Sequence, residues 1–175
     1  MRNSEISKCR GGRAVLIAED NEDERVLVQS IFRQLGVRDD IYVVSDGGEA
    51  LAFLKGEGKY SDRERFRFPS FLLTDINMPR MDGLELLMYL KRSNLIVVPT
   101  IVFTSSDDPD DIRQAYMLGA NAYHVKSPDM ESQREQVRML HQYWCNVEQP
   151  AVDRFGKLSP SQTEKGRESG RHPVK

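Results

Sequence analysis

The chain has 175 residues, 30% of them charged, and a formal net charge of -2. This length suits one domain with appendages, and the near balance of charge supplies neither a basic field for nucleic acid nor an acidic solvating tail. The start lacks a secretory signal, and no apolar run approaches the roughly 20 residues of a membrane span, so we expect a soluble chain that binds neither nucleic acid nor membrane. Cys9 and Cys145 are too isolated for a disulfide framework, which favours a cytoplasmic location.

The first elements form a strand and helix pair. Residues 1–12 are polar and end in glycine, so we expect a flexible lead-in before a domain over residues 13–148. The continuously apolar run Ala14–Ala18 predicts a short strand that is covered on both faces. Apolar residues then recur at helical spacing over residues 23–35, and Gly36 supplies a left-handed stop.

A second unit repeats the first. Residues 41–44 predict another buried strand, and Asp46 with Glu49 has the spacing of a capping box for a helix that runs through Leu54. Residues 55–70 are long for a connection between a helix and a strand, and they are rich in charge, glycine and aromatic side chains. We expect them to form an inserted surface loop.

Three more repeats follow. Apolar runs predict strands at residues 72–75, Thr100–Thr104 and Ala122–Val125. Helical patterns follow each run: one after Gly83, one from Asp107 or Asp108 to Gly119, and one over residues 130–147. Right-handed crossovers then give an α/β fold, a doubly wound five-stranded parallel sheet with helices on both faces. Residues 149–175 have few apolar residues and no period, which predicts a disordered tail.

Charged and hydroxyl side chains stand at the predicted strand ends. They are Glu19 and Asp20 after the first strand, Asp75 after the third, Thr104 on the fourth and Lys126 after the fifth. The carboxyl ends of parallel strands meet at one crevice, where crowded carboxylates raise one another's pKa unless a cation lies among them. Magnesium fits, because it takes oxygen ligands at about 2.1 Å and commonly uses one or two carboxylates plus a phosphate oxygen.

This arrangement predicts phosphoryl chemistry at Asp75. An aspartate can form a covalent phosphoryl intermediate when a metal offsets the charge of the transferring group. An ammonium from Lys126 and a hydroxyl from Thr104 would stabilise the equatorial oxygens of that group. The backbone carbonyl of Asn77, two residues after Asp75, is a further candidate metal ligand.

The runs LIAED, LLTDINMPRMDG, IVFTSS and GANAYHVKS together resemble the receiver domain of two-component response regulators, which is a flavodoxin-like fold. The resemblance covers nearly all of residues 13–148. It implies a phosphoacceptor at Asp75, an acid pair of Glu19 (through water) and Asp20 that holds Mg²⁺ with Asp75 and the Asn77 carbonyl, phosphoryl contacts from Thr104 and Lys126, and a switch aromatic at Tyr123.

Two features depart from the common pattern of that family. The usual Lys-Pro step is replaced by Lys126, Ser127 and Pro128, so the cis peptide that the family implies after the lysine would cost about 3 kcal/mol at a non-proline bond; the isomer stays open. The inserted residues 55–70 and the run YWCN near the end of the last helix resemble stand-alone receivers that serve phytochrome-type histidine kinases.

The resemblance therefore implies a phosphorylation-controlled switch and not an enzyme. Its partner would be a sensor histidine kinase, for which a bacteriophytochrome is one candidate. Because no effector domain is recognised in the sequence, output would come through protein contacts, dimerisation or phosphorelay. Tyr143 and Trp144 motivate a homodimer through the fourth and last helices and the fifth strand, although Trp144 has an equal claim to a core position.

Two other functions compete with this interpretation. A hydrolase of the haloacid dehalogenase kind also uses a strand-end aspartate and magnesium, but that family places a second acid where this chain has Asn77. A binding scaffold with the same fold would not depend on phosphorylation. Dinucleotide binding is disfavoured, because the turn after the first strand is acidic where a glycine-rich turn is needed.

Overall fold

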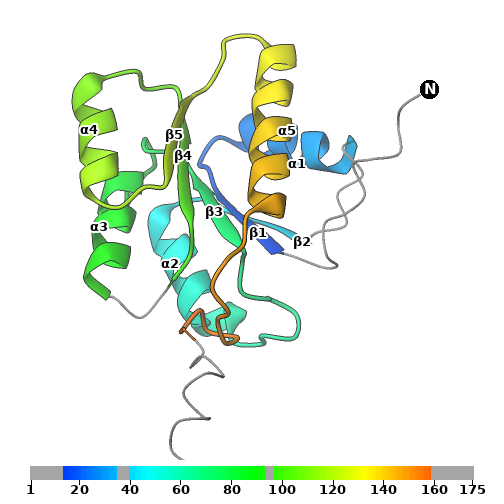
Figure 1. Ribbon diagram of the computed structural model, residues 1–175, viewed down its shortest axis with the longest axis vertical. Coiled ribbons are helices and arrows are strands. Elements are labelled where there is room, and N and C mark those ends of the chain that lie inside the picture. Colours follow the sequence, from blue (N-terminus) through cyan, green and yellow to red (C-terminus); the bar gives the residue numbers. More distant parts are fainter. Residues whose placement is uncertain (1–13, 35–39, 94–96, 159–175) are drawn as a thin grey trace, which may run out of the picture.

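The computed structural model describes residues 14–34, 40–93 and 97–158. One parallel sheet has the strand order β2-β1-β3-β4-β5, which confirms the predicted doubly wound arrangement (Figure 1). The strands are β1 (Ala14–Ala18), β2 (Asp40–Val44), β3 (Phe71–Thr74), β4 (Thr100–Thr104) and β5 (Ala122–Val125). The helices are α1 (Glu22–Gln34), α2 (Gly47–Lys55), the 3-10 turn η1 (Gly58–Tyr60), α3 (Gly83–Ser93), α4 (Pro109–Met117) and α5 (Met130–Asn146).

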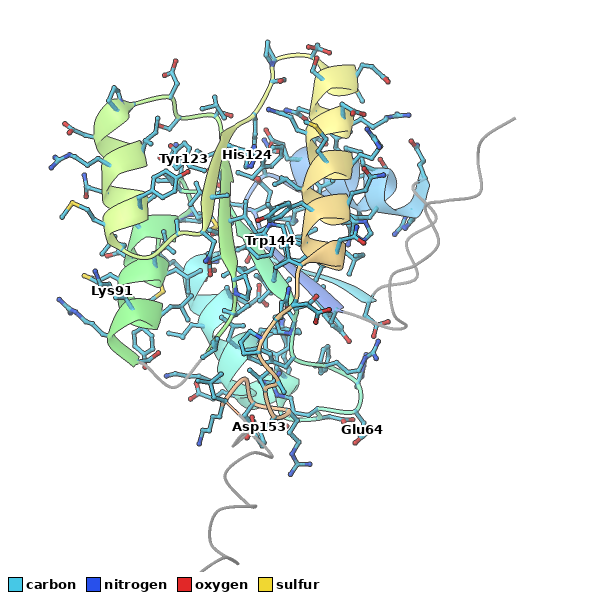
Figure 2. All side chains as sticks on the ribbon, viewed as in Figure 1. Glu64, Lys91, Tyr123, His124, Trp144 and Asp153 are labelled. Carbon is cyan, nitrogen blue, oxygen red and sulfur yellow. The ribbon has the colours of Figure 1, made fainter. Side chains whose placement is uncertain are left out.

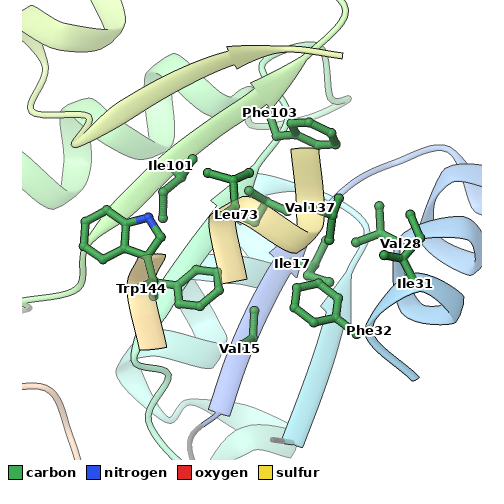
Figure 3. Packing of buried hydrophobic residues seen from close by; sticks show 12 residues of the cluster. Val15, Ile17, Val28, Ile31, Phe32, Leu73, Ile101, Phe103, Val137 and Trp144 are labelled. Carbon is green, nitrogen blue, oxygen red and sulfur yellow. The ribbon is translucent and has the colours of Figure 1, made fainter. Parts of the chain in front are cut away.

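The sheet separates two apolar layers. Helices α1 and α5 cover one face, while α2, α3 and α4 cover the other (Figure 1). On the first face, Ile17 of β1 packs with Phe32 of α1 and Val137 of α5 (Figure 3). Trp144 is buried in the same cluster, with its ring centroid 6.3 Å from that of Phe71. Of the two roles considered for Trp144, the structure supports the core position.

Aspartates begin several helices. Asp46 accepts a hydrogen bond from the backbone N–H of Glu49 at 2.8 Å, and the Glu49 carboxylate accepts one from the N–H of Ser45 at 3.0 Å. The capping interaction predicted for α2 is present, although Glu49 reaches the residue before the cap. Helix α4 is capped by Asp108, with Pro109 in its first turn. These caps satisfy backbone donors that the first turn of a helix leaves free.

The inserted segment runs over the surface as predicted, with most of its residues exposed or half-buried, but some of its side chains pack against the domain. Tyr60 and Arg63 are each less than 10% exposed. The Tyr60 ring centroid lies 4.9 Å from that of Phe53 in α2, and its hydroxyl donates to Glu49 at 2.9 Å. These side chains are buried because the aromatic residues of the segment cover an apolar side of α2 that would otherwise face water.

The chain after α5 returns to the inserted segment, where the Arg63 guanidinium lies 5.7 Å from the centroid of the Phe155 ring. The backbone N–H of Val97 donates to the Gly156 carbonyl at 2.9 Å, and Val152 forms an isolated antiparallel bridge with Leu158. Predicted disorder therefore does not hold for residues 149–158. The remainder of the predicted tail, the lead-in over residues 1–12 and the helix stop at Gly36 lie outside the described residues. No helix in the described ranges is long and apolar enough to cross a bilayer.

Candidate functional site

The backbone fixes Asp75 and Lys126 at the carboxyl ends of β3 and β5. The Asp75 N–H donates to the carbonyl of Ala18 at 2.9 Å, and the Lys126 N–H donates to that of Thr104 at 2.7 Å. Helix α3 begins at Gly83, directly against this edge. A Cβ on residue 83 would lie 2.2 Å from the Asp75 carbonyl oxygen. The structure therefore brings these two strand-end residues to the same edge of the sheet.

Both oxygens of the Asp75 carboxylate have partners. Oδ1 accepts from the backbone N–H groups of Ile76 at 2.6 Å and Asn77 at 3.2 Å. Oδ2 accepts from the Lys126 ammonium at 2.7 Å. The loop after β3 thus holds one oxygen, and the other faces the buried cation.

Lys126 lies at the centre of a buried charge network. Its Nζ lies 2.7 Å from Glu19, 2.5 Å from Glu24 and 2.7 Å from Asp75. Oxygens of the three carboxylates lie within 4.8 Å of one another. Glu24 was not among the predicted site residues. Its only signal is a place in the acidic first turn of α1, and acids are ordinary there because they favour the positive end of the helix dipole.

The charges of this network depend on one another. Burial raises the pKa of Glu19, and its contacts with Lys126 only partly counter that effect. Burial alone would lower the pKa of Lys126, but the neighbouring carboxylates, Asp75 first, raise it above the ordinary lysine value. The ammonium therefore stays charged at neutral pH. With every carboxylate ionised, the three acids and one lysine carry two formal negative charges, which favours a hard divalent cation with oxygen ligands.

The predicted acid pair is split. Glu19 is buried and contacts Lys126, whereas Asp20 is exposed and lies outside the cluster of carboxylates. The backbone carbonyl of Asp20 accepts a hydrogen bond from Arg25 at 2.8 Å. Asn77 is also exposed, and its backbone N–H donates to the Asp75 carboxylate. Asp20 and Asn77 are thus exposed, while their sequence neighbours Glu19 and Asp75 are buried.

Thr104 and Tyr123 meet through Ser106. The buried Thr104 hydroxyl oxygen accepts from the Ser106 N–H at 3.3 Å, and the Tyr123 hydroxyl donates to the Ser106 carbonyl at 3.0 Å. The Tyr123 ring is half-buried on the side of β5 that faces α4 (Figure 2). Both side chains therefore contact the same loop residue, Ser106.

The segment after Lys126 is tied to α5. The Ser127 N–H donates to the Gln136 side chain at 3.1 Å, and Gln136 donates in turn to the Val125 carbonyl at 2.8 Å. The peptide bonds of the described residues are trans, that between Lys126 and Ser127 included. The isomer that the sequence left open is thereby assigned.

Comparison with known proteins identifies a family. Residues 15–138 match the model of the response regulator receiver domain. Response regulator Rcp1 of Synechocystis sp. is 30% identical over 136 residues, covering 77% of this chain and 90% of its own length. A probable methanogenesis regulatory protein, FilR2 of Methanothrix harundinacea, is 33% identical over 134 residues, covering 74% of this chain and 82% of its own length.

Solved structures agree with these relatives. Response regulator RPA3017, described in red light signalling of R. palustris, has a TM-score of 0.74 at 30% identity, covering 80% of this chain and 99% of its own. The phosphorylated cyanobacterial phytochrome response regulator RcpA has a TM-score of 0.71 at 28% identity, covering 79% and 98%. The Mn²⁺-bound form of Rcp1 has a TM-score of 0.70 at 29% identity, covering 79% and 99%.

Proposed function

The chain belongs to the family of response regulator receiver domains, and from this premise we propose that it is a switch that accepts a phosphoryl group on Asp75 from a sensor histidine kinase. The observation that carries the proposal is the position of Lys126, whose ammonium joins Asp75 to two further acids at a buried edge of the sheet. An ammonium at this position can stabilise the oxygens of a dianionic group, and a bound cation would offset the remaining negative charge of the acids.

In phosphoryl transfer, the protein mainly positions the reacting groups and stabilises the charge on the phosphoryl oxygens. An Asp75 carboxylate oxygen forms a bond to phosphorus while the P–N bond of a phosphohistidine breaks, and the electron pair of that bond returns to the imidazole nitrogen. Of the two carboxylate oxygens, Oδ2 accepts a hydrogen bond from the Lys126 ammonium, and Oδ1 accepts hydrogen bonds from two backbone amides. Lys126 would then donate to an oxygen of the transferred group, as phosphoryl transfer requires.

The residues that would hold Mg²⁺ are Glu19 through water, Asp20, Asp75 and the Asn77 carbonyl. Carboxylate and carbonyl oxygens suit this hard cation, and the excess negative charge of the cluster supports it. When bound, the ion supplies electrostatic stabilisation of the phosphoryl oxygens. Glu24 joins this set as a residue that balances Lys126 from the rim of the site.

Tyr123 would report phosphorylation through Thr104 and Ser106. A phosphoryl oxygen that accepts from the Thr104 hydroxyl draws that side chain toward Asp75 and disturbs its contact with the Ser106 backbone. The Tyr123 hydroxyl, which donates to the same residue, then loses its fixed partner. The two arrangements differ in their contacts with the phosphoryl group, which is the condition for a population shift.

The partner and the output are part of the same proposal. Similarity to Rcp1 and to the phytochrome response regulator RcpA supports a phytochrome-type histidine kinase as the phosphoryl donor.

Output would proceed through protein contacts, phosphorelay or a homodimer. The face formed by α4, β5 and α5 supports a homodimer, because apolar side chains are exposed on each element: Tyr116, Met117, Val125 and Tyr143. A sedimentation experiment that shows a monomer both with and without a phosphoryl mimic would exclude that dimer.

Intact-mass labelling with acetyl phosphate tests the proposal. The natural chain should gain one phosphoryl group in the presence of Mg²⁺ and none in the presence of a chelator. Asp75→Asn should not be labelled. Asp82→Asn is the matched control, because Asp82 lies in the same loop and Asn is an equally good helix cap there; it should be labelled like the natural chain. Equal labelling of Asp75→Asn would contradict the proposal, and a chain that binds Mg²⁺ but accepts no phosphoryl group even from a phosphorylated kinase would favour a scaffold.

A further inference from the structure

Glu24 differs from the other two acids that contact Lys126. The Glu19 carboxylate also accepts a hydrogen bond from the backbone N–H of Asn21 at 3.0 Å, and that of Asp75 accepts two from the loop after β3. Within the part of the chain that the structure describes, the Glu24 carboxylate has Lys126 as its one polar partner, at 2.5 Å. The Glu24 side chain is 30% exposed, whereas those of Glu19 and Asp75 are 5% and 9% exposed. Glu24 is therefore the acid that is most easily released from Lys126.

The backbone around Glu24 is held by contacts that do not involve its carboxylate. The Asn21 side chain accepts from the backbone N–H groups of Asp23 at 2.9 Å and Glu24 at 3.3 Å, at the start of α1. The Arg25 guanidinium donates to the Asp20 carbonyl at 2.8 Å, which ties the first turn of the helix to the end of β1. Release of the Glu24 carboxylate therefore requires rotation within its own side chain and no change in the helix.

The three donors of the Lys126 ammonium are matched by three carboxylates. A lysine ammonium has three N–H donors and no acceptor, and carboxylate oxygens of Glu19, Glu24 and Asp75 all lie within 2.7 Å of Nζ. The Lys126 side chain is 3% exposed, so solvent offers no second route to the ammonium. A phosphoryl group that approaches Asp75 must therefore displace one of these carboxylates before it can accept a hydrogen bond from Lys126.

The position of the Glu24 carboxylate is also one that a phosphoryl oxygen needs. One of its oxygens lies 2.5 Å from the Lys126 Nζ and within 4.8 Å of a carboxylate oxygen of Asp75. A phosphoryl oxygen on a phosphorus atom bonded to Asp75 must lie in the same region in order to accept from the same ammonium. Two negative groups at such a distance repel each other, and more strongly near a protein surface than in bulk water. The Glu24 carboxylate and the phosphoryl group thus compete for one place beside Lys126.

We propose that Glu24 is a displaceable counterion of Lys126 that slows phosphoryl transfer to Asp75, because it must leave the ammonium before the incoming group can be stabilised there. This inference rests on the proposed function and concerns its rate. Glu24 forms no bond to phosphorus and transfers no proton, so the bonds that form and break are those of the transfer already described. The Glu24 carboxylate moves to solvent, and a phosphoryl oxygen replaces it as the acceptor. Glu24 thus acts through Lys126 and is not itself a catalytic residue.

Rates of labelling with acetyl phosphate, at a Mg²⁺ concentration that saturates each chain, test this role. Glu24→Gln removes the charge and Glu24→Ala removes the whole carboxylate. Both variants should be labelled about fivefold faster than the natural chain, the change that release of one partly exposed ion pair predicts. Glu22→Gln is the matched control, because Glu22 is an exposed acid in the same first turn of α1 and its loss changes the net charge equally; it should be labelled like the natural chain. Slower or unchanged labelling of both Glu24 variants would overturn the proposal, as would equal acceleration in Glu22→Gln.

Reductive methylation of Lys126, located by mass spectrometry in the presence of a chelator, tests the contact without phosphoryl transfer. Lys126 should be methylated several-fold faster in Glu24→Ala than in the natural chain, because its ammonium is no longer covered from the solvent side. Exposed Lys157 should react at the same rate in both chains, and unchanged hydrogen exchange of the β1 amides should show that the sheet is intact.

The two measurements separate this inference from the proposed function. Equal protection of Lys126 in Glu24→Ala and in the natural chain would overturn the role of Glu24 while Asp75 could still be labelled. Faster methylation in chains that accept no phosphoryl group would overturn the proposed function and, with it, the effect of Glu24 on transfer, whereas the contact between Glu24 and Lys126 would stand.

Discussion

Lys126 is the residue on which the acidic site depends for its stability. Its ammonium is the partner of three carboxylates, and its side chain is 3% exposed. Removal of one partner from a buried ionic group leaves uncompensated charge, which costs about 3–5 kcal/mol.

We therefore expect Lys126→Met to lower the free energy of unfolding by about 2–4 kcal/mol in the presence of a chelator. Added Mg²⁺ should restore more stability to the variant than to the natural chain, because the cation then binds a site with one more negative charge. Urea denaturation with and without Mg²⁺ measures both effects, with Lys157→Met, an exposed lysine, as the control. An equal response of the variant and the natural chain to Mg²⁺ would contradict this role.

Glu49 makes the stability of the domain depend on acid pH. Burial alone would raise the pKa of Glu49, but hydrogen bonds from Lys59, the Ser45 amide and Tyr60 outweigh it and lower the pKa from 4.5 to about 2. A carboxyl group whose pKa is lowered by folding stabilises the folded state above its unfolded pKa. That stabilisation is lost as the pH falls from about 4.5 to about 2.

Glu49→Gln should lower the free energy of unfolding at pH 7 by about 1–2 kcal/mol, a figure that allows for the exposure of Lys59. The variant should also lose less stability than the natural chain between pH 5 and pH 2, because it has no such group to protonate. Denaturation at a series of pH values measures this slope, with Glu64→Gln as the control. Parallel pH profiles for Glu49→Gln and the natural chain would show that another group is responsible.

The sequence predicted which residues follow the strands but not the direction of every side chain. Asp75 and Lys126 directly follow strands, so the sheet itself fixes their positions. Asp20 also lies just after a strand but points to solvent, while Glu24, a turn further on, reaches Lys126. Strand alternation stops at the strand end, and the turn that follows decides which acid faces inward. That turn depends on contacts of Asn21 and Arg25 that no periodic pattern records.

The start of α3 packs closely against the loop that follows Asp75. A Cβ on Gly83 would meet the Asp75 carbonyl oxygen at 2.2 Å and the Ile76 backbone at 2.9 Å. Neither is the end of a flexible side chain. The absence of a side chain at Gly83 therefore lets α3 begin beside the loop that follows Asp75.

Gly83→Ala should destabilise the domain by about 2–4 kcal/mol, because overpacking against backbone exceeds the gain of about 1 kcal/mol that alanine brings to a helix. It should also slow labelling of Asp75, since the loop must move to relieve the clash. Urea denaturation and the rate of acetyl phosphate labelling are the measurements. Arg92→Ala in the same helix is the control and should leave both unchanged. A Gly83→Ala chain that is more stable than the natural one would contradict the close packing.

Among the elements, the periodic ones were predictable and the packing of the inserted segment was not. Continuous apolar runs such as Ala14–Ala18 have only one good position in a domain, the centre of a covered sheet. Residues 55–70 are charged and rich in glycine, and nothing in that composition shows that Tyr60 and Arg63 are buried. Their burial results from an apolar side of α2 and from the returning chain after α5, which are contacts between distant parts of the sequence.

For the whole molecule, the structure places two separate regions at opposite ends of one sheet. The acidic site lies at the carboxyl ends of the strands, and the inserted segment with the chain after α5 lies at their amino ends. In that second region Gly156 contacts Phe68 closely and Phe155 covers Arg63. Among the described residues, no side chain belongs to both regions.

A chain that ends after residue 148 should therefore be less stable than one that ends after residue 158, by about 1–3 kcal/mol for the apolar surface exposed. Both chains should accept a phosphoryl group at the same rate, because the missing residues lie far from Asp75. Thermal unfolding and acetyl phosphate labelling of the two chains measure these effects. Equal stability would show that the returning segment contributes nothing, and unequal labelling would show that the two ends are coupled.

Chemical mapping of the phosphorylated residue tests the central claim most directly. The chain is labelled with acetyl phosphate and Mg²⁺ and then treated with borohydride, which reduces an acyl phosphate to an alcohol and leaves free carboxylates unchanged. The peptide that contains residues 71–83 is then sequenced by mass spectrometry. The account predicts homoserine at position 75 and unmodified aspartate at position 82. Reduction at any other residue, or none after labelling by mass, would contradict the assignment of Asp75 as the phosphoacceptor.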